Sequence, residues 1–233
     1  KHCSSLFQHP ILEHGNGFQY IENIIKIQGQ NSIGEIRNGQ SNIIDIMMET
    51  GTGKTYTYTK TIFELNKNFG IYKFVVVVPT LSIKAGTIDF LKSESSREHF
   101  IEQYGKTINL HIVESKKGNK NKKSYMPPAV NSFVTSGNFA KKSIQVMIIN
   151  AGMINSETMQ KTFDKGLFDK YNTPFDGIAS VNPFLIIDEP HKFSQANKTW
   201  ENIQKMNPQF ILRYGATFQE YENLVYTLSA VES

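Results

Sequence analysis

The chain has 233 residues, enough for one large domain or two small ones around a buried core. Its 25 Lys and Arg residues exceed its 21 Asp and Glu residues by a margin that permits nucleic-acid binding without indicating it. The single cysteine, Cys3, excludes an internal disulfide framework and a zinc site built on cysteines, and it favours a reducing compartment.

Short apolar runs alternate along the chain with segments of helical character. Near-continuous runs of this kind are typical of strands in a parallel sheet that is covered on both faces. The runs lie at residues 42–48, 73–79, 143–150, 183–188 and 209–215, with a sixth candidate at 109–113. No uncharged apolar run is long enough to cross a membrane, and the first residues lack the apolar core of a signal peptide. We therefore expect a cytoplasmic protein with no membrane partner.

Helical segments are predicted between the strands, at residues 55–68, 81–92 and 95–104, the first and last ended by Gly70 and Gly105. Strand and helix in alternation predict a doubly wound α/β domain with right-handed crossovers. Residues 1–17 show no clear period. Residues 115–138 read as a long loop or hairpin, and 218–233 as a short polar connection.

The stretch GTGKT, residues 51–55, follows one predicted strand and opens a predicted helix, as a phosphate-binding loop requires. Gly51 and Gly53 allow a tight turn whose amides face one point, and the helix dipole favours an anion there. Lys54 is placed to reach the β- and γ-phosphates of a nucleotide, and the Thr55 hydroxyl to hold Mg²⁺. The general motif has a further glycine where this chain has Met48, so the motif is incomplete in that form.

A second carboxylate site is predicted where NPFLIIDEPHKF ends its apolar run. Asp188 projects from the C-terminal edge of the strand, where ligands of open parallel sheets gather, and would order the Mg²⁺ shell. Glu189 would polarise the attacking water. His191 follows directly and lies within reach of this site, although a lone histidine is more often structural.

GTGKT together with DEPH resembles the superfamily 2 helicases and translocases. Four stretches, METGTGKTYTY, FELNKNFGIYKFVVVVPTLSIKAG, NPFLIIDEPHKF and FILRYGATF, resemble the Res subunits of type III restriction-modification enzymes. The resemblance covers most of residues 45–226 and is weakest between 106 and 140. It implies a RecA-like P-loop lobe, a mostly parallel sheet with helices on both faces, in which ATP hydrolysis drives translocation or switching on double-stranded DNA before cleavage.

The resemblance also implies an organisation. We expect residues 1–40 to pack on or lead into the lobe, 41–217 to form it, and 218–233 to begin a linker. A second RecA-like lobe with an arginine finger and a nuclease domain would lie elsewhere in the same polypeptide, so that this segment alone has little activity. A Mod methyltransferase subunit is the implied partner.

Several residues acquire roles from the resemblance. Pro79, Thr80 and Gly152 would face DNA, while Ala216 and Thr217, with His191, would couple the nucleotide site to movement. In the third motif Gly215 replaces the usual serine, which puts one hydrogen bond in doubt. Gln19 is the candidate for reading adenine, and Gln28 and Gln30 compete with it. The implied ATP-binding loop consists of Thr50, Gly51, Thr52, Gly53, Lys54 and Thr55.

Alternative readings remain open at this point. Another DExH-type DNA or RNA helicase would share the same motifs. A small-molecule kinase would need a lid of arginines, and Arg37, Arg97 and Arg213 do not cluster in the sequence. The run KKGNKNKK at 116–123 could grip phosphates, but a solvated loop is the simpler interpretation.

Overall fold

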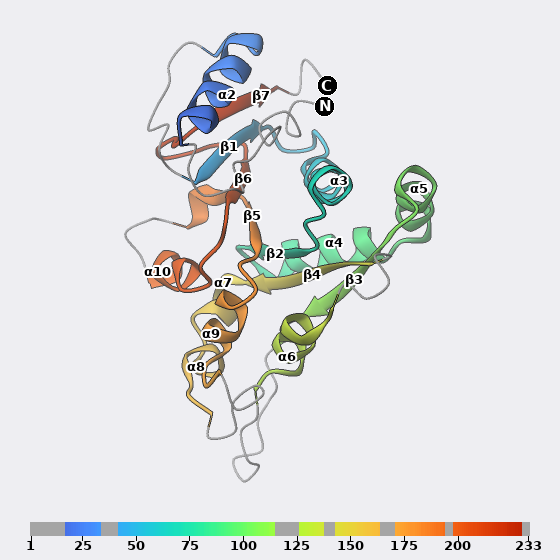
Figure 1. Ribbon diagram of the computed structural model, residues 1–233, viewed down its shortest axis with the longest axis vertical. Helices are drawn as coiled ribbons and strands as arrows, with labels where there is room; N and C mark the ends of the chain where they lie inside the picture. The colour runs from blue at the N-terminus through green and yellow to red at the C-terminus, as the bar shows by residue number, and fades with distance from the viewer. Residues whose placement is uncertain are drawn as a thin grey trace. The chain divides into compact units, whose positions relative to one another are not determined.

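The computed structural model describes residues 17–33, 42–114, 126–137, 143–163, 171–193 and 198–229. These residues form two compact units, which Figure 1 shows in colours that follow the chain. The first unit draws its residues from Lys1–Ile71, Ile187–His191 and Phe210–Ser233, and the second from Tyr72–Ile186 and Lys192–Gln209.

The first unit contains three parallel strands. β1 (Ile43–Met48) lies between β6 (Ile211–Gly215) and β7 (Leu224–Leu228), and two helices, α2 (Gly17–Gln30) and α3 (Lys54–Phe69), pack with these strands. The strands β1 and β6 were predicted from their apolar runs. The strand β7 was not, because it lies within residues 218–233, which were interpreted as a polar connection, although LVYTL is as long as β6.

The helix α3 packs one face against β6, as its predicted apolar positions require. Tyr58, Ile62 and Leu65 are fully buried. The Tyr58 ring meets the Tyr214 ring edge-on with centroids 5.8 Å apart, and the Thr61 and Tyr214 hydroxyls lie 3.0 Å from each other. The helix that follows the phosphate loop is therefore fixed to the strand that precedes the third motif.

The helix α2 covers the edge strand β7. The Gln28 side-chain amide donates to the Leu224 carbonyl at 2.8 Å, and the Asn31 amide donates to the Val225 carbonyl at 2.7 Å. These bonds satisfy carbonyls that an edge strand would otherwise leave unpaired. Gln28 is buried and engaged in this contact, which argues against it as the residue that reads adenine.

The second unit contains a parallel sheet in the order β3 (Thr107–Ile112), β4 (Ser143–Asn150), β2 (Lys73–Val78). The strand β5 (Phe184–Asp188) contributes its first three residues to this unit and its last two to the first unit. The remaining helical elements are α4 (Leu81–Lys92), α5 (Glu94–Tyr104), α6 (Pro128–Thr135), α7 (Ala151–Ile154), α8 (Glu157–Gln160), α9 (Pro174–Ala179), α10 (Lys198–Gln204) and the 3₁₀ turn η1 (Pro190–Lys192).

Helices cover both sides of this sheet, because α4 contacts β2 and β4 while α6 contacts β3 and β4 on the other side (Figure 1). The Lys73 ammonium donates to the carbonyls of Phe133 and Val134 at the end of α6, and burial lowers the pKa of Lys73 to about 8. The prediction of a loop or hairpin over 115–138 is wrong for its described part, since α6 occupies it.

The expected α/β fold with parallel strands is thus confirmed, including the sixth candidate strand as β3. Among the described residues, no helix combines the length and the hydropathy that crossing a bilayer would need.

Candidate functional site

The loop between β1 and α3 makes a tight turn. Gly51 and Gly53 have φ angles of 88° and 84°, which L side chains rarely adopt. The Thr52 amide and hydroxyl both approach the Glu49 carbonyl, at 3.3 and 2.7 Å. Gly53 caps α3 without a side-chain acceptor, so no capping side chain takes up the first amides of this helix, which could bind an anion.

Lys54 and Glu189, predicted separately from two motifs, meet in an ion pair. The Lys54 Nζ atom lies 2.9 Å from Glu189 Oε1, and the two side chains are only 10% and 14% exposed. Lys54 Nζ also lies 3.5 Å from the Met48 carbonyl oxygen. The lysine that would bind phosphate is therefore paired with the carboxylate that would activate water.

Asp188, the last residue of β5, is almost completely buried. Burial, assisted by the neighbouring Glu189 charge, raises the pKa of Asp188 to about 6, while Lys54 acts in the opposite direction. Its Oδ1 atom has no hydrogen-bond partner within the part of the chain that the structure describes. A buried carboxylate oxygen without a partner is costly, and a cation would satisfy it.

Glu189 adopts a backbone conformation that is unusual for its residue type. Its φ angle of 56° lies in the left-handed region, and its amide donates to the Tyr214 carbonyl at 2.8 Å. Its Oε2 atom lies 3.4 Å from His191 Nδ1. Such backbone strain costs about 1–3 kcal/mol and gathers at functional sites. The carboxylate is thus held between Lys54 and His191.

The third motif, residues 214–217, packs directly on the acidic segment. A Cβ atom added to Gly215 would lie 2.6 Å from Pro190 Cδ, closer than real Cβ contacts allow. A glycine stands where related motifs have serine because the proline ring occupies that space. Ala216 is half-buried and Thr217 is exposed. An approach of Thr217 to His191 is not among the contacts of the described residues.

Replacing Gly215 with Ala should destabilise the fold, because the new methyl group must displace the Pro190 ring. Overpacking of this kind costs about 1–3 kcal/mol. In urea unfolding, the double variant Gly215→Ala with Pro190→Ala should lose less stability than the sum of the two single variants. Additive losses would show that the two residues are not in steric contact.

Titration of Asp188 should leave a signature in the pH dependence of stability. Its folded-state pKa of about 6 exceeds the ordinary value of 3.8, so the folded state binds the proton more tightly between these limits. This carboxyl therefore lowers the free energy of unfolding as pH rises through that window, by about 3 kcal/mol in total. Relative to the non-titrating Asp188→Asn variant, the parent should lose stability from pH 4 to pH 7 without Mg²⁺. If the difference in unfolding free energy between the parent and Asp188→Asn stayed constant from pH 4 to pH 7, the burial of this charge would be contradicted.

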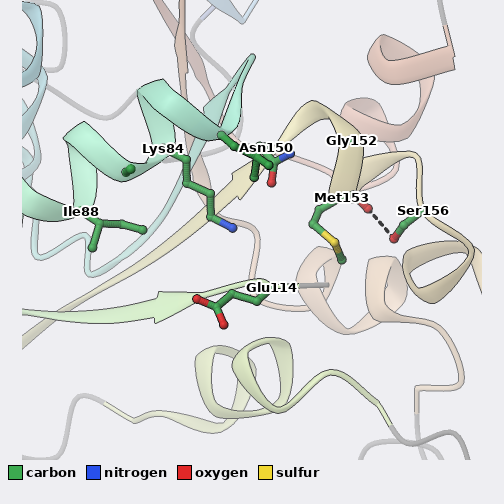
Figure 2. A pocket seen from close by; sticks show the side chains of 9 residues that line it. Lys84, Ile88, Glu114, Asn150, Gly152, Met153 and Ser156 are labelled. Atoms are coloured by element: carbon green, nitrogen blue, oxygen red, sulfur yellow. Dashed lines mark hydrogen bonds between the residues drawn. The ribbon is translucent and has the colours of Figure 1, made fainter. Parts of the chain in front are cut away.

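In the second unit, a pocket of about 610 Å³ opens where β2 and β4 end (Figure 2). Thr80 caps α4 by accepting from the Ile83 amide at 3.3 Å, and the first residue of that helix, Leu81, is 69% exposed. Gly152 lines the pocket close to Asn150, whose buried Oδ1 atom lacks a partner among the described residues. Gly152 thus shares this pocket with Leu81, which follows Thr80, whereas Pro79 and Thr80 do not line it.

Lys84 extends into the same pocket between Asn150 and Glu114 (Figure 2). Its ammonium donates to the Val113 carbonyl, and burial lowers its pKa while the charge of Glu114 opposes the shift. This lysine therefore already serves the backbone, as do the Ile83 and Lys84 amides, which donate to Thr80.

The family model described as type III restriction enzyme, res subunit, matches residues 18–220. The chain belongs to this family. It is 57% identical over 221 residues to the Res subunit of EcoP15I from Escherichia coli and 56% identical over 221 residues to that of EcoPI from Escherichia phage P1. Each match covers 92% of this chain but only 23% of the relative, so the chain spans about a quarter of their length.

Among solved structures, a nuclease-deletion mutant of the type ISP restriction-modification enzyme LlaGI, in complex with a DNA substrate mimic, is similar to this Res-family chain. The identity is 17%, the TM-score is 0.43, and the match covers 91% of this chain and 18% of the other.

The residues of the Res-family site fit Mg²⁺ rather than a metal held by protein alone. Within the described ranges, no group of three or more His, Cys, Asp and Glu side chains could hold a metal ion. Magnesium is usually bound through one or two protein oxygens together with waters and substrate phosphates. The unpartnered, buried Asp188 oxygen is a donor of that kind, and the Thr55 hydroxyl at the start of α3 is the second oxygen that the sequence predicts.

For the other predicted positions, the structure gives no support for the predicted role. Gln19 lies near the start of α2, whereas the lysine run at 116–123, Cys3 and Arg37 lie outside the described residues. Arg213 is engaged in a buried ion pair with Asp45 and is unavailable for a phosphate lid. The sequence analysis missed this pair, although one charge inside each of two apolar strands, IIDIMM and ILRYG, could have indicated it.

Proposed function

We propose that this region of the Res-family chain binds ATP and hydrolyses it with Mg²⁺. The observation that carries the proposal is the meeting of Lys54 and Glu189 at 2.9 Å beside the unpartnered, buried oxygen of Asp188. Three groups with complementary tasks converge there: a cation for phosphate, a carboxylate for water and a carboxylate for metal.

The chain's own residues divide the work. The amides of residues 51–55, which include Thr52, bind the phosphates with Thr50 just before them. Lys54 exchanges Glu189 for a phosphate oxygen. Glu189, released from that ion pair, accepts a proton from the attacking water while His191 remains beside its Oε2 atom. Mg²⁺, held by Thr55 and Asp188, would neutralise charge on the β- and γ-phosphates. Gln19 remains the proposed adenine contact.

We further propose that hydrolysis is coupled to movement or switching on double-stranded DNA before cleavage, in the cytoplasm and together with a Mod methyltransferase subunit. The family membership and the relatives' description as restriction-modification enzymes support this. Pro79, Thr80 and Gly152 would contact the DNA backbone, and Ala216 and Thr217 would transmit the nucleotide state. A second RecA-like lobe and a nuclease domain would belong to the longer polypeptide.

Turnover measurements test the proposal directly. The full natural polypeptide, with its Mod partner and Mg²⁺, should hydrolyse ATP faster when double-stranded DNA carrying the recognition site is added. Stimulation by RNA in place of double-stranded DNA would favour another DExH-type helicase. Absence of nucleotide binding would overturn the assignment altogether.

A further inference from the structure

A buried ion pair joins the two strands that lead into the nucleotide site. Asp45 of β1 and Arg213 of β6 are register partners, and Arg213 Nε and Nη2 donate to Asp45 Oδ1 and Oδ2 at 2.6 and 2.7 Å. Asp45 is fully buried and Arg213 nearly so. Such two-pronged contacts fix geometry more strictly than a single hydrogen bond does.

The same pair holds the segment that follows the third motif. The Glu222 amide donates to Asp45 Oδ2 at 2.7 Å, and Arg213 Nη2 donates to the Glu220 carbonyl at 3.1 Å. The Arg213 guanidinium also lies over the Phe218 ring, 5.5 Å from its centroid. Residues 218–223 are therefore attached to the core of the first unit through these two side chains.

Successive residues of β6 project to opposite faces, so Arg213 and Tyr214 serve different neighbours. Tyr214 faces α3, where its hydroxyl meets Thr61, and its carbonyl accepts from the Glu189 amide. Arg213 faces the other side, where residues 218–223 lie. Two consecutive residues of β6 thus hold different parts of the unit. Tyr214 contacts α3 and Glu189, while Arg213 contacts residues 218–223, which follow the third motif.

We propose that Asp45 and Arg213 are positioning residues for ATP hydrolysis, which hold the strand of the phosphate loop, the strand of the third motif and residues 218–223 in one fixed arrangement. The inference rests on the proposed function. Neither side chain touches the reacting atoms. Their effect passes through the register of β1 and β6, which sets where Lys54 and Glu189 stand relative to each other.

The first test uses Arg213→Lys and Asp45→Asn in the full natural polypeptide. Lysine keeps the charge but cannot form the two-pronged contact, and asparagine keeps the shape but loses the charge. Each variant should bind a non-hydrolysable ATP analogue with affinity within about twofold of the parent. The turnover number should fall by about 10- to 100-fold, as small misplacements of reacting groups do. The double variant should fall no further than the more impaired single variant, because both changes break one contact.

Val130→Ala provides a control, since it truncates a fully buried side chain of α6 in the second unit, whose contacts are with α9, β3 and β4. It should lower thermal stability and leave turnover unchanged. If Arg213 has a purely structural role, Arg213→Lys should also lower thermal stability and leave turnover unchanged. That result would overturn the inference. Additive losses in the double variant would overturn it as well.

Hydrogen exchange on the parent protein gives a second test that does not depend on how variants fold. The Glu189 amide lies at the nucleotide site, and the Glu222 amide is bonded to Asp45. Binding of the analogue should slow exchange at both amides. Slowing at Glu189 alone would sink the inference and spare the proposed function. If calorimetry detected no binding of the analogue and neither amide responded, both would fail.

Discussion

Glu189→Gln in the full natural polypeptide should lower ATP turnover by about 10²–10⁴-fold, the usual share of a positioned general base. Nucleotide affinity should stay close to that of the parent, because the amide matches the carboxylate in shape and Lys54 remains available for the phosphates. DNA cleavage should fall with turnover if the proposed coupling holds. Paired measurements of nucleotide affinity and steady-state turnover check this result.

A suitable control for that change is Glu98→Gln, which makes the same substitution at an exposed position of α5 in the second unit. The nucleotide affinity and the ATP turnover of this control should both match those of the parent. Unchanged turnover with normal binding in Glu189→Gln would remove Glu189 from the catalytic role and assign the water to Asp188 or to a residue of another domain.

Lys54→Ala should weaken binding of an ATP analogue by about 10- to 100-fold, since a charge-assisted hydrogen bond contributes roughly 1.5–3 kcal/mol. Binding should not vanish, because the amides of the phosphate loop and the N-terminus of α3 remain. The same change leaves Glu189 without its 2.9 Å partner in a largely buried position, so thermal stability should also fall.

Isothermal titration calorimetry measures the affinity loss. Lys67→Ala removes an exposed ammonium from the last turn of the same helix and serves as the matched variant, with affinity expected to equal that of the parent. Equal affinity in Lys54→Ala and the parent would show that the lysine does not contact the phosphates.

Apolar pattern was enough to predict the strands that bury both faces. β1, β2, β4, β5 and β6 are near-continuous apolar runs, and their lengths and turn residues mark their ends. The edge strand β7, LVYTL, has strand-forming residues but was missed because polar residues surround it. In the structure it is held by the neighbouring β1 and by side-chain amides of α2. The helix α6 was missed because it sits within a stretch whose composition is typical of loops.

The sequence predicted the residues of the candidate site but not the contacts between them. Lys54, Asp188 and Glu189 were predicted because each ends or follows a strand within a recognisable motif. Their pairing could not be predicted, because it depends on which strands are neighbours and in which register. The close approach of Gly215 to Pro190 is of this kind. One charge inside each of two apolar strands could have suggested that Asp45 and Arg213 pair, but the register that joins them came from the structure.

The most direct test of the central claim is an experimental structure with a non-hydrolysable ATP analogue and Mg²⁺. The account predicts the triphosphate at the amides of residues 51–55, the Lys54 ammonium on a phosphate oxygen instead of Glu189, and the buried Asp188 oxygen engaged in the metal's coordination shell. An analogue bound elsewhere, or one bound while the 2.9 Å contact between Lys54 and Glu189 stays intact, would contradict it.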